Sequence, residues 1–222
     1  LADGSINEYD PEFLWNYELS SRRLFLSGAL QWNTNLFYAD WTDQQVPVPV
    51  SEEVSELFIT VNAGESTVYG LESDLRWLVS SALEVYGSIG LLRTEFDDFP
   101  NANAGPDDPE NFAGNQFFFA PELSLNAGFD YQHPNGFFAG VDVNHQSGAF
   151  SDQANVAVNE VGDYTLVNVR AGYRFGDRYR LTLYARNATD AEYFTFLDRD
   201  ANNDFARVGD PRVIGARFDL DF

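Results

Sequence analysis

The sequence predicts an all-β fold: an antiparallel meander of about nine long strands that forms part of a larger transmembrane β-barrel. Apolar and polar residues alternate along most of the chain, and its connections alternate between short and long. Aromatic residues make up 16% and hydrophobic residues 44% of the 222 residues. No apolar run approaches the roughly 18 residues of a transmembrane helix, so only strands could cross a membrane.

The first two predicted strands cover 12–19 and 30–39. In the first, Trp15, Tyr17 and Leu19 alternate with polar residues, and such side chains point to opposite faces of a strand. A short polar break over 20–27 is expected to separate the two. The stretch 43–64 contains Pro47 and Pro49, which are excluded from a central ladder, so it is expected to be a long connection with an extended edge near 57–61.

Alternation resumes after this connection and predicts seven more strands. A strong hairpin signal, His133-Pro134-Asn135-Gly136, stands between two of them. The seven strands are expected at 67–79, 83–91, 121–131, 137–144, 165–175, 179–186 and 212–222.

The connections support the barrel. Short turns around Ser80, Pro134 and Gly176 alternate with long connections over 43–64, 97–114, 148–162 and 187–210. Outer-membrane barrels have short turns at one rim and long loops at the other, whereas a soluble sandwich has no reason to keep this order. If the long loops are extracellular, the short turns and the C-terminus lie on the periplasmic side.

The last predicted strand shows the two faces most clearly. Its apolar residues are expected to face lipid, and Arg217 and Asp219 to face the lumen. The apolar set, Ile214, Phe218, Leu220 and Phe222, is the candidate signal for barrel assembly.

Composition excludes several functions. The net charge is −22 and all 13 basic residues are arginine, which argues against nucleic-acid binding. Cys is absent, so there is neither a disulfide framework nor a thiolate metal site. The sequence opens Leu1-Ala2-Asp3 without a signal peptide, which fits either the mature form of a secreted protein or an internal cut from a longer polypeptide. The internal cut is the preferred expectation.

An ordered set of motifs resembles the barrel of TonB-dependent outer-membrane receptors. The set comprises WNYEL at 15–19, LFYADWTDQQV at 36–46, NAG at 62–64, YGLE at 69–72, YTLVN at 164–168, ARNATDAEY at 185–193, GDPR at 209–212 and the terminal Phe222. The resemblance implies a 22-stranded barrel to which residues 1–222 contribute the C-terminal part.

The same resemblance implies an N-terminal plug domain and a TonB box, neither of which occurs in these residues. It implies the outer membrane of a Gram-negative bacterium as the location. The cargo would be a small molecule or metal chelate: most often a ferric siderophore, with cobalamin, haem or a carbohydrate as alternatives. The expected partners are outer-membrane lipid, the TonB complex through the N-terminal part, and the barrel assembly machinery through the C-terminal strand.

Five arginines on the lumen face of two adjacent strands are candidate ligand-binding residues, since guanidinium groups match anionic ligands. The preferred alternative is an ion-pair network inside the lumen, or docking of the plug. The five are Arg170, Arg174, Arg178, Arg180 and Arg186, and the candidate carboxylate partners are Glu18, Glu72, Asp74, Glu84 and Asp142.

A calcium-like loop is a second candidate site. Asp198, Asp200, Asn202 and Asp204 place oxygen ligands at alternate positions, but the glycine and the final glutamate of a calcium loop are missing. A solvated loop is the preferred interpretation, and no other cofactor is expected.

The acidic loop 96–117 contains several phenylalanines, which could bind a ligand or form an aromatic girdle at the membrane interface. Catalysis is not expected, because neither His133 nor His145 has a Ser or Cys nearby in a nucleophile context.

Three functions therefore compete. The first is a TonB-dependent transport receptor. The second is a secreted acidic β-sandwich that binds calcium at 198–204, and the third is a smaller porin-like barrel or adhesin.

The terminal strand generates the first prediction. Phe222→Asp in the full-length protein should abolish outer-membrane assembly, because it places a charge at the end of the lipid-facing strip. Surface labelling of intact cells measures the amount, and normal surface levels of the variant would refute the assignment.

Overall fold

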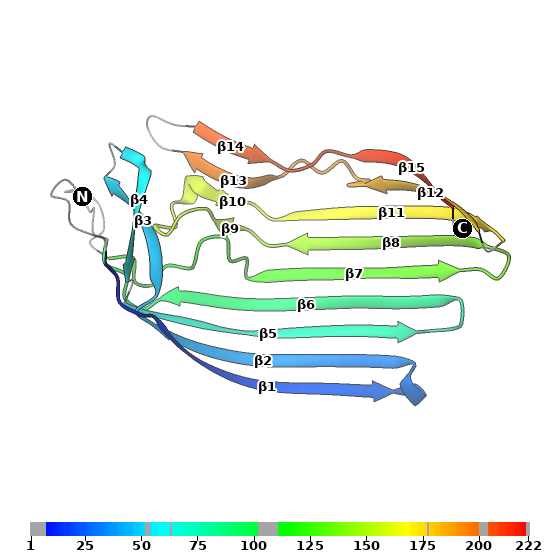
Figure 1. Cartoon of the computed structure of the whole chain (residues 1–222), viewed down its shortest axis with the longest axis horizontal. Helices are drawn as coiled ribbons and strands as arrows, with labels where there is room; N and C mark the ends of the chain where they lie inside the picture. The colour runs from blue at the N-terminus through cyan, green and yellow to red at the C-terminus, as the bar shows by residue number, and fades with distance from the viewer. Residues whose placement is uncertain are drawn as a thin grey trace.

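Nine strands form one continuous antiparallel sheet (Figure 1). The computed structural model describes residues 8–51, 54–62, 64–101, 111–176, 178–199 and 204–220. In spatial order the strands are β1 (Phe13–Phe25), β2 (Leu30–Thr42), β5 (Glu65–Leu78), β6 (Leu83–Phe96), β7 (Leu123–Gln132), β8 (Phe137–Gln146), β11 (Tyr164–Phe175), β12 (Tyr179–Arg186) and β15 (Val213–Leu220). The predicted meander is confirmed, and its spatial order follows the chain order.

The polar break predicted over 20–27 is wrong. β1 continues to Phe25, which pairs with Leu30 of β2, and the chain reverses over the 3-10 turn η1 (Leu26–Gly28). Ser20 Oγ donates to Asn35 Oδ1 across the pair at 2.6 Å. Ser20 and Arg22 lie on the polar face of the strand and Ser21 and Arg23 on the other face, so this polar run belongs to the strand and not to a turn.

Three shorter hairpins occupy connections that the sequence predicts to be long loops. In the first, Pro47 and Pro49 pair opposite Thr60 and Phe58, which proline tolerates because no third strand joins this hairpin in the part of the chain that the structure describes. The expected extended edge near 57–61 is part of it. The hairpins are β3 (Gln45–Ser51) with β4 (Val54–Asn62), β9 (Ala149–Phe150) with β10 (Glu160–Val161), and β13 (Phe194–Arg199) with β14 (Asp204–Val208).

Short and long connections alternate as predicted, so the sheet has a short-turn end and a long-loop end (Figure 1). The three short hairpins all lie at the long-loop end, on the left of Figure 1. The β7–β8 turn is the predicted one: His133 N–H donates to the Phe137 carbonyl at 2.7 Å, and Gly136 takes a φ of +101°. None of the helices in the described residues, η1 and η2 (Ala157–Asn159) among them, has the length and apolarity needed to cross a membrane.

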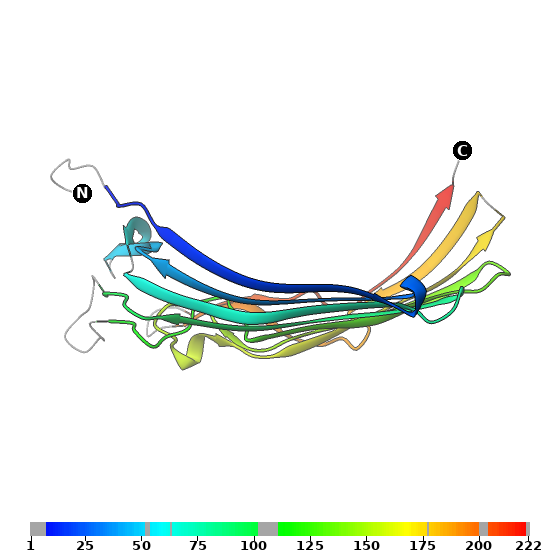
Figure 2. The ribbon, with the colours of Figure 1, turned by 90° about the horizontal axis from the view of Figure 1, so that it is seen from below.

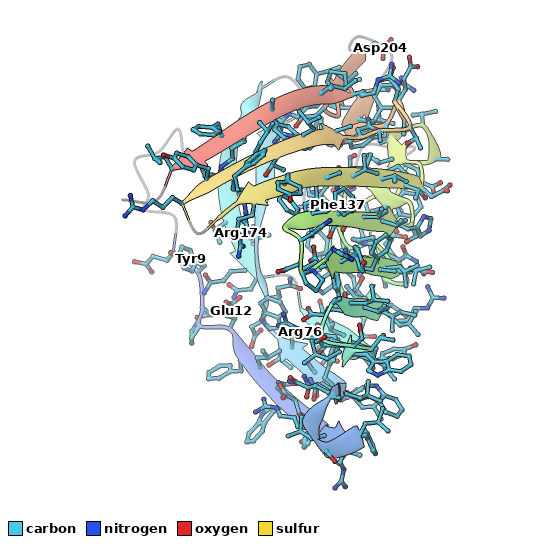
Figure 3. The ribbon with its side chains drawn as sticks, turned by 90° about the vertical axis from the view of Figure 1, so that its right-hand side faces the viewer. Tyr9, Glu12, Arg76, Phe137, Arg174 and Asp204 are labelled. Carbon is cyan, nitrogen blue, oxygen red and sulfur yellow. The ribbon has the colours of Figure 1, made fainter. Side chains whose placement is uncertain are left out.

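The sheet is bent into a trough, seen from its side in Figure 2 and along its strands in Figure 3. Its convex face is apolar. The register aligns five leucines in one row across five strands, and the first of them, Leu19, is 71% exposed. This row is Leu19, Leu36, Leu71, Leu91 and Leu123. An uncovered row of this kind suits a lipid environment, because apolar surface in water is unfavourable.

The terminal strand β15 forms one edge of the sheet and pairs only with β12 in the described structure. Its apolar side chains share the convex face: Ile214 is 75%, Phe218 62% and Leu220 41% exposed. Phe222 lies outside the described residues. The role of this set as an assembly signal stays a prediction.

The phenylalanines of loop 96–117, predicted either to bind a ligand or to form an interfacial girdle, lie instead in the buried core. Phe96 and Phe99 are each 1% exposed and Phe112 is 8% exposed, with neighbouring ring centroids at 4.8 and 5.4 Å. Ile59 and Val61 of β4 pack against this cluster. The loop folds back on itself because burying three phenyl rings outweighs exposing them as a ligand grip or a girdle.

On the concave face, aromatic rings lie across glycines of the next strand. Phe37 covers Gly70, Tyr86 covers Gly128, and Phe138 covers Gly172. The missing Cβ leaves a gap that a flat ring fills, so each pair locks two neighbouring strands together.

These pairs generate the second prediction. A methyl group at position 172 would collide with the Leu181 carbonyl oxygen and the Phe138 ring, so Gly172→Ala should lower the free energy of unfolding by about 1–3 kcal/mol. Urea unfolding of the full-length protein in detergent measures it. Gly90→Ala is the matched control, because its nearest atom, Ser124 Cβ, lies at 3.9 Å. Equal stability of the two variants would contradict the packing.

Candidate functional site

The concave face is the polar surface of this chain and the candidate functional site. It holds a hollow of about 1030 Å³ lined mainly by short polar side chains. Among them, Asn33 donates to Asp74 at 2.9 Å, and Asn126 donates to Asn144 at 2.8 Å. Arg76 and Arg174, labelled in Figure 3, belong to the same face.

Arg170 makes two ion pairs on this face. Its Nη1 donates to Asp142 Oδ2 at 2.6 Å, and its Nη2 donates to Asp130 Oδ1 at 2.5 Å. The hydroxyl of Tyr86 donates to the other oxygen of Asp142. The network therefore joins four adjacent strands: β6, β7, β8 and β11.

Backbone register and two glycines make this network possible. Arg170 lies opposite Gly140 on β8, so its guanidinium can cross the strand to reach Asp130 on β7. Likewise Tyr86 lies opposite Gly128 and crosses it to reach Asp142. A side chain at either glycine would close the path.

The network carries one positive and two negative charges, and each of the three charged side chains is between 24% and 38% exposed. Partial burial strengthens these ion pairs relative to a fully exposed pair. Both terminal nitrogens of Arg170 already donate to carboxylates. In this arrangement the guanidinium links neighbouring strands, and its two terminal nitrogens are not free to bind an anionic ligand side by side.

The other predicted arginines are not gathered around Arg170. Arg174 lies opposite Arg180 at the short-turn end, and Arg180 lies over the Phe138 ring at 5.1 Å. Arg186 is at the other end of β12, 6.0 Å from the Tyr184 ring centre, and Arg178 belongs to the β11–β12 turn. Ligand binding by this set stays a prediction.

Two of the expected carboxylate partners do pair with arginine. Asp142 contacts Arg170, and Glu84 Oε1 accepts from Arg76 Nε at 2.7 Å. Asp130 was missed as a partner. Its polar-face position was evident from alternation, but the diagonal reach over Gly140 depends on the register between strands, which sequence alone does not provide.

The calcium-like loop is described only in part. Asp200 and Asn202 lie outside the described residues, while Asp204 accepts from Arg199 Nε at 3.0 Å. Asp198 ends up on β13 and Asp204 on β14. Within the described ranges no three His, Asp or Glu side chains are grouped so as to hold a metal ion. Calcium binding stays a prediction.

Comparison with known proteins gives a consistent result. Residues 2–188 match the family model described as TonB dependent receptor-like, beta-barrel. The chain is 24% identical over 214 residues to the pesticin receptor of Yersinia pestis, covering 93% of this chain and 29% of that protein.

Solved structures agree in fold. The ferric yersiniabactin uptake receptor FyuA from Yersinia pestis superposes with a TM-score of 0.76 and 21% identity, over 95% of this chain and 30% of that chain. The siderophore receptor PiuA from Acinetobacter baumannii gives 0.77 and 20%, over 95% and 29%. The chain thus spans less than a third of the length of each relative, and each relative is named as a receptor.

The central network generates the third prediction. Arg170→Met leaves Asp130 and Asp142 close together without their cation, and should cost about 1–2 kcal/mol of unfolding free energy. Arg174→Met is the matched control, since it removes a guanidinium from the same strand and face. Urea unfolding compares them, and a loss as large in Arg174→Met would mean that Arg170 has no special bracing role.

Proposed function

Because this chain belongs to the TonB-dependent receptor β-barrel family, we propose that it forms the C-terminal part of the barrel of an outer-membrane uptake receptor. The proposed cargo is a scarce nutrient, with a ferric siderophore as the first choice. Cobalamin, haem and carbohydrate are the alternatives. Uptake draws its energy from the TonB complex.

One observation supports this proposal above the others: a single sheet with one apolar and one polar face that keeps short turns at one end and long loops at the other. A transmembrane wall needs an apolar outside and a polar lumen side. The uncovered leucine row and the Arg170 network meet these two needs on opposite faces of the same strands.

The partners follow from this placement. The convex face contacts outer-membrane lipid, the long-loop end faces the medium, and the short-turn end faces the periplasm. TonB contact belongs to the N-terminal part of the full-length protein. Assembly uses β15, whose outer edge is open to a further strand in the described structure.

The soluble β-sandwich is disfavoured by the same geometry. A sandwich buries one face of each sheet against a second sheet. Here the convex leucines lie uncovered, with Leu36 at 46% and Leu91 at 44% exposure. Membership of the receptor family likewise disfavours a small porin-like barrel or adhesin.

Uptake of radioactive iron tests the proposal. Cells that express the full-length protein are offered a panel of ferric siderophores, and accumulation should exceed that of cells without the gene. In an otherwise identical strain lacking TonB, accumulation should fall to the background level. Equal accumulation with and without the gene, for iron, cobalamin, haem and carbohydrates, would contradict the proposal.

A further inference from the structure

A second, smaller pocket lies at the long-loop end, with a volume of about 180 Å³. Its wall is mainly apolar and aromatic, and it comes from four parts of the chain: the loop before β7, the β8–β9 segment, the β10–β11 segment and β13. The apolar contributors are Phe119, Pro121, Ala149, Val161 and Phe194, with the ring of Tyr164 beside them.

Backbone contacts hold these segments together without any ligand. The N–H of Phe119 donates to the Phe150 carbonyl at 2.9 Å, and the N–H of Ser147 donates to the Leu123 carbonyl at 2.9 Å. Tyr164 stacks on Tyr193, the residue before β13, with ring centroids 4.4 Å apart. The pocket is therefore preformed, which lowers the entropic cost of binding.

Phe119 is held in an unusual backbone conformation at the edge of this pocket. Its φ is +55°, in the left-handed region that a bulky residue rarely adopts. Its ring is 51% exposed and contacts Phe118 and Phe196, with centroids at 5.4 and 6.0 Å. Backbone strain that keeps an aromatic ring half exposed beside a pocket is typical of a ligand clamp.

One polar group in the pocket, Gln146 Nε2, is free to bind a ligand. The Tyr164 hydroxyl donates to Gln146 Oε1, which leaves the Nε2 of the same amide for another partner. Gln146 Nε2 then has no hydrogen-bond partner among the residues that the structure describes. The Ser147 hydroxyl, in contrast, already accepts from Leu123 N–H and donates to the Gly148 carbonyl.

The size of the pocket limits what it can take. A cavity of about 150 Å³ accommodates a benzene molecule, whereas whole ligands of drug size need about 300 Å³ or more. We propose that this pocket binds a single planar aromatic ring that carries a hydrogen-bond acceptor, with the acceptor on Gln146 Nε2 and the ring between Phe119 and Phe194.

The pocket also adjoins the larger hollow. Gln146 and Tyr164 line both of them, so a ring bound here can be the substituent of a molecule that lies on the concave face. This step rests on the proposed function: the cargo would then be a metal chelate bearing a one-ring aromatic group.

Benzamide, which joins a phenyl ring to a carbonyl acceptor, is the first probe. Saturation-transfer NMR on the purified full-length protein in detergent should detect benzamide binding. Neither acetamide, which lacks the ring, nor cyclohexanecarboxamide, whose ring is not flat, should bind comparably. Ala149→Leu fills the pocket and should abolish the signal, while Val158→Leu, at a 55% exposed position of the same loop, should preserve it.

Gln146→Leu is the second variant, and it should weaken benzamide binding while toluene still binds. Heat-modifiable gel mobility checks that each variant is folded. Failure of benzamide to bind the folded wild type, or equal binding to wild type and folded Ala149→Leu, would overturn the pocket assignment whatever the protein transports.

A matched pair of chelates tests the link to uptake. A ferric trihydroxamate with a benzoyl-capped amine should bind the wild type about tenfold or more tightly than its acetyl-capped twin, from burial of the ring. Ala149→Leu should remove this preference without changing the affinity for the acetyl form. Uptake of both chelates without a preference for the benzoyl form would overturn the link between the pocket and the cargo, but not the proposed function. The absence of any TonB-dependent cargo would overturn the proposed function.

Discussion

The hydrogen-bonded ladder between neighbouring strands is the constraint on which the rest of this structure depends. It runs without interruption from β1 to β15 and pairs the backbone groups along each strand. In lipid such pairing is obligatory, because no water is present to satisfy a free N–H or carbonyl. The same ladder sets the register, and the register decides which side chains meet. The leucine row, the glycine–aromatic pairs and the Arg170 network are all consequences of it.

The two ends and the two faces of the sheet have different roles. Contacts within the chain leave much of the convex face uncovered, as the 75% exposure of Ile214 illustrates. Burial of apolar side chains is concentrated at the long-loop end, in the cluster of Phe96, Phe99 and Phe112. This cluster anchors the β3–β4 hairpin to the β6–β7 connection. The long-loop end also carries the smaller pocket, beside the hollow of the concave face.

Much of the fold could be predicted from the sequence because strand alternation is local. Trp15, Tyr17 and Leu19 already fixed the orientation of β1, and the turn at Pro134 set the β7–β8 hairpin. The site was less predictable, because it depends on contacts between strands. Asp130 meets Arg170 only across Gly140, and the burial of Phe96 depends on β4 and Phe112, which its neighbours in the sequence do not reveal. The polar residues Ser20 and Arg22 suggested a break between two strands, but their side chains belong to the polar face of the sheet.

In the proposed barrel, one face of each strand of the nine-stranded sheet meets lipid and the other meets water. The 222 residues contain no Cys, so single cysteines at Leu183 (convex) and Thr182 (concave) can carry spin labels without background from them. Collision rates with lipid-soluble oxygen and a water-soluble nickel complex are measured on the full-length protein in lipid vesicles. We expect high oxygen access at position 183 and high nickel access at position 182. High nickel access at both positions would contradict it.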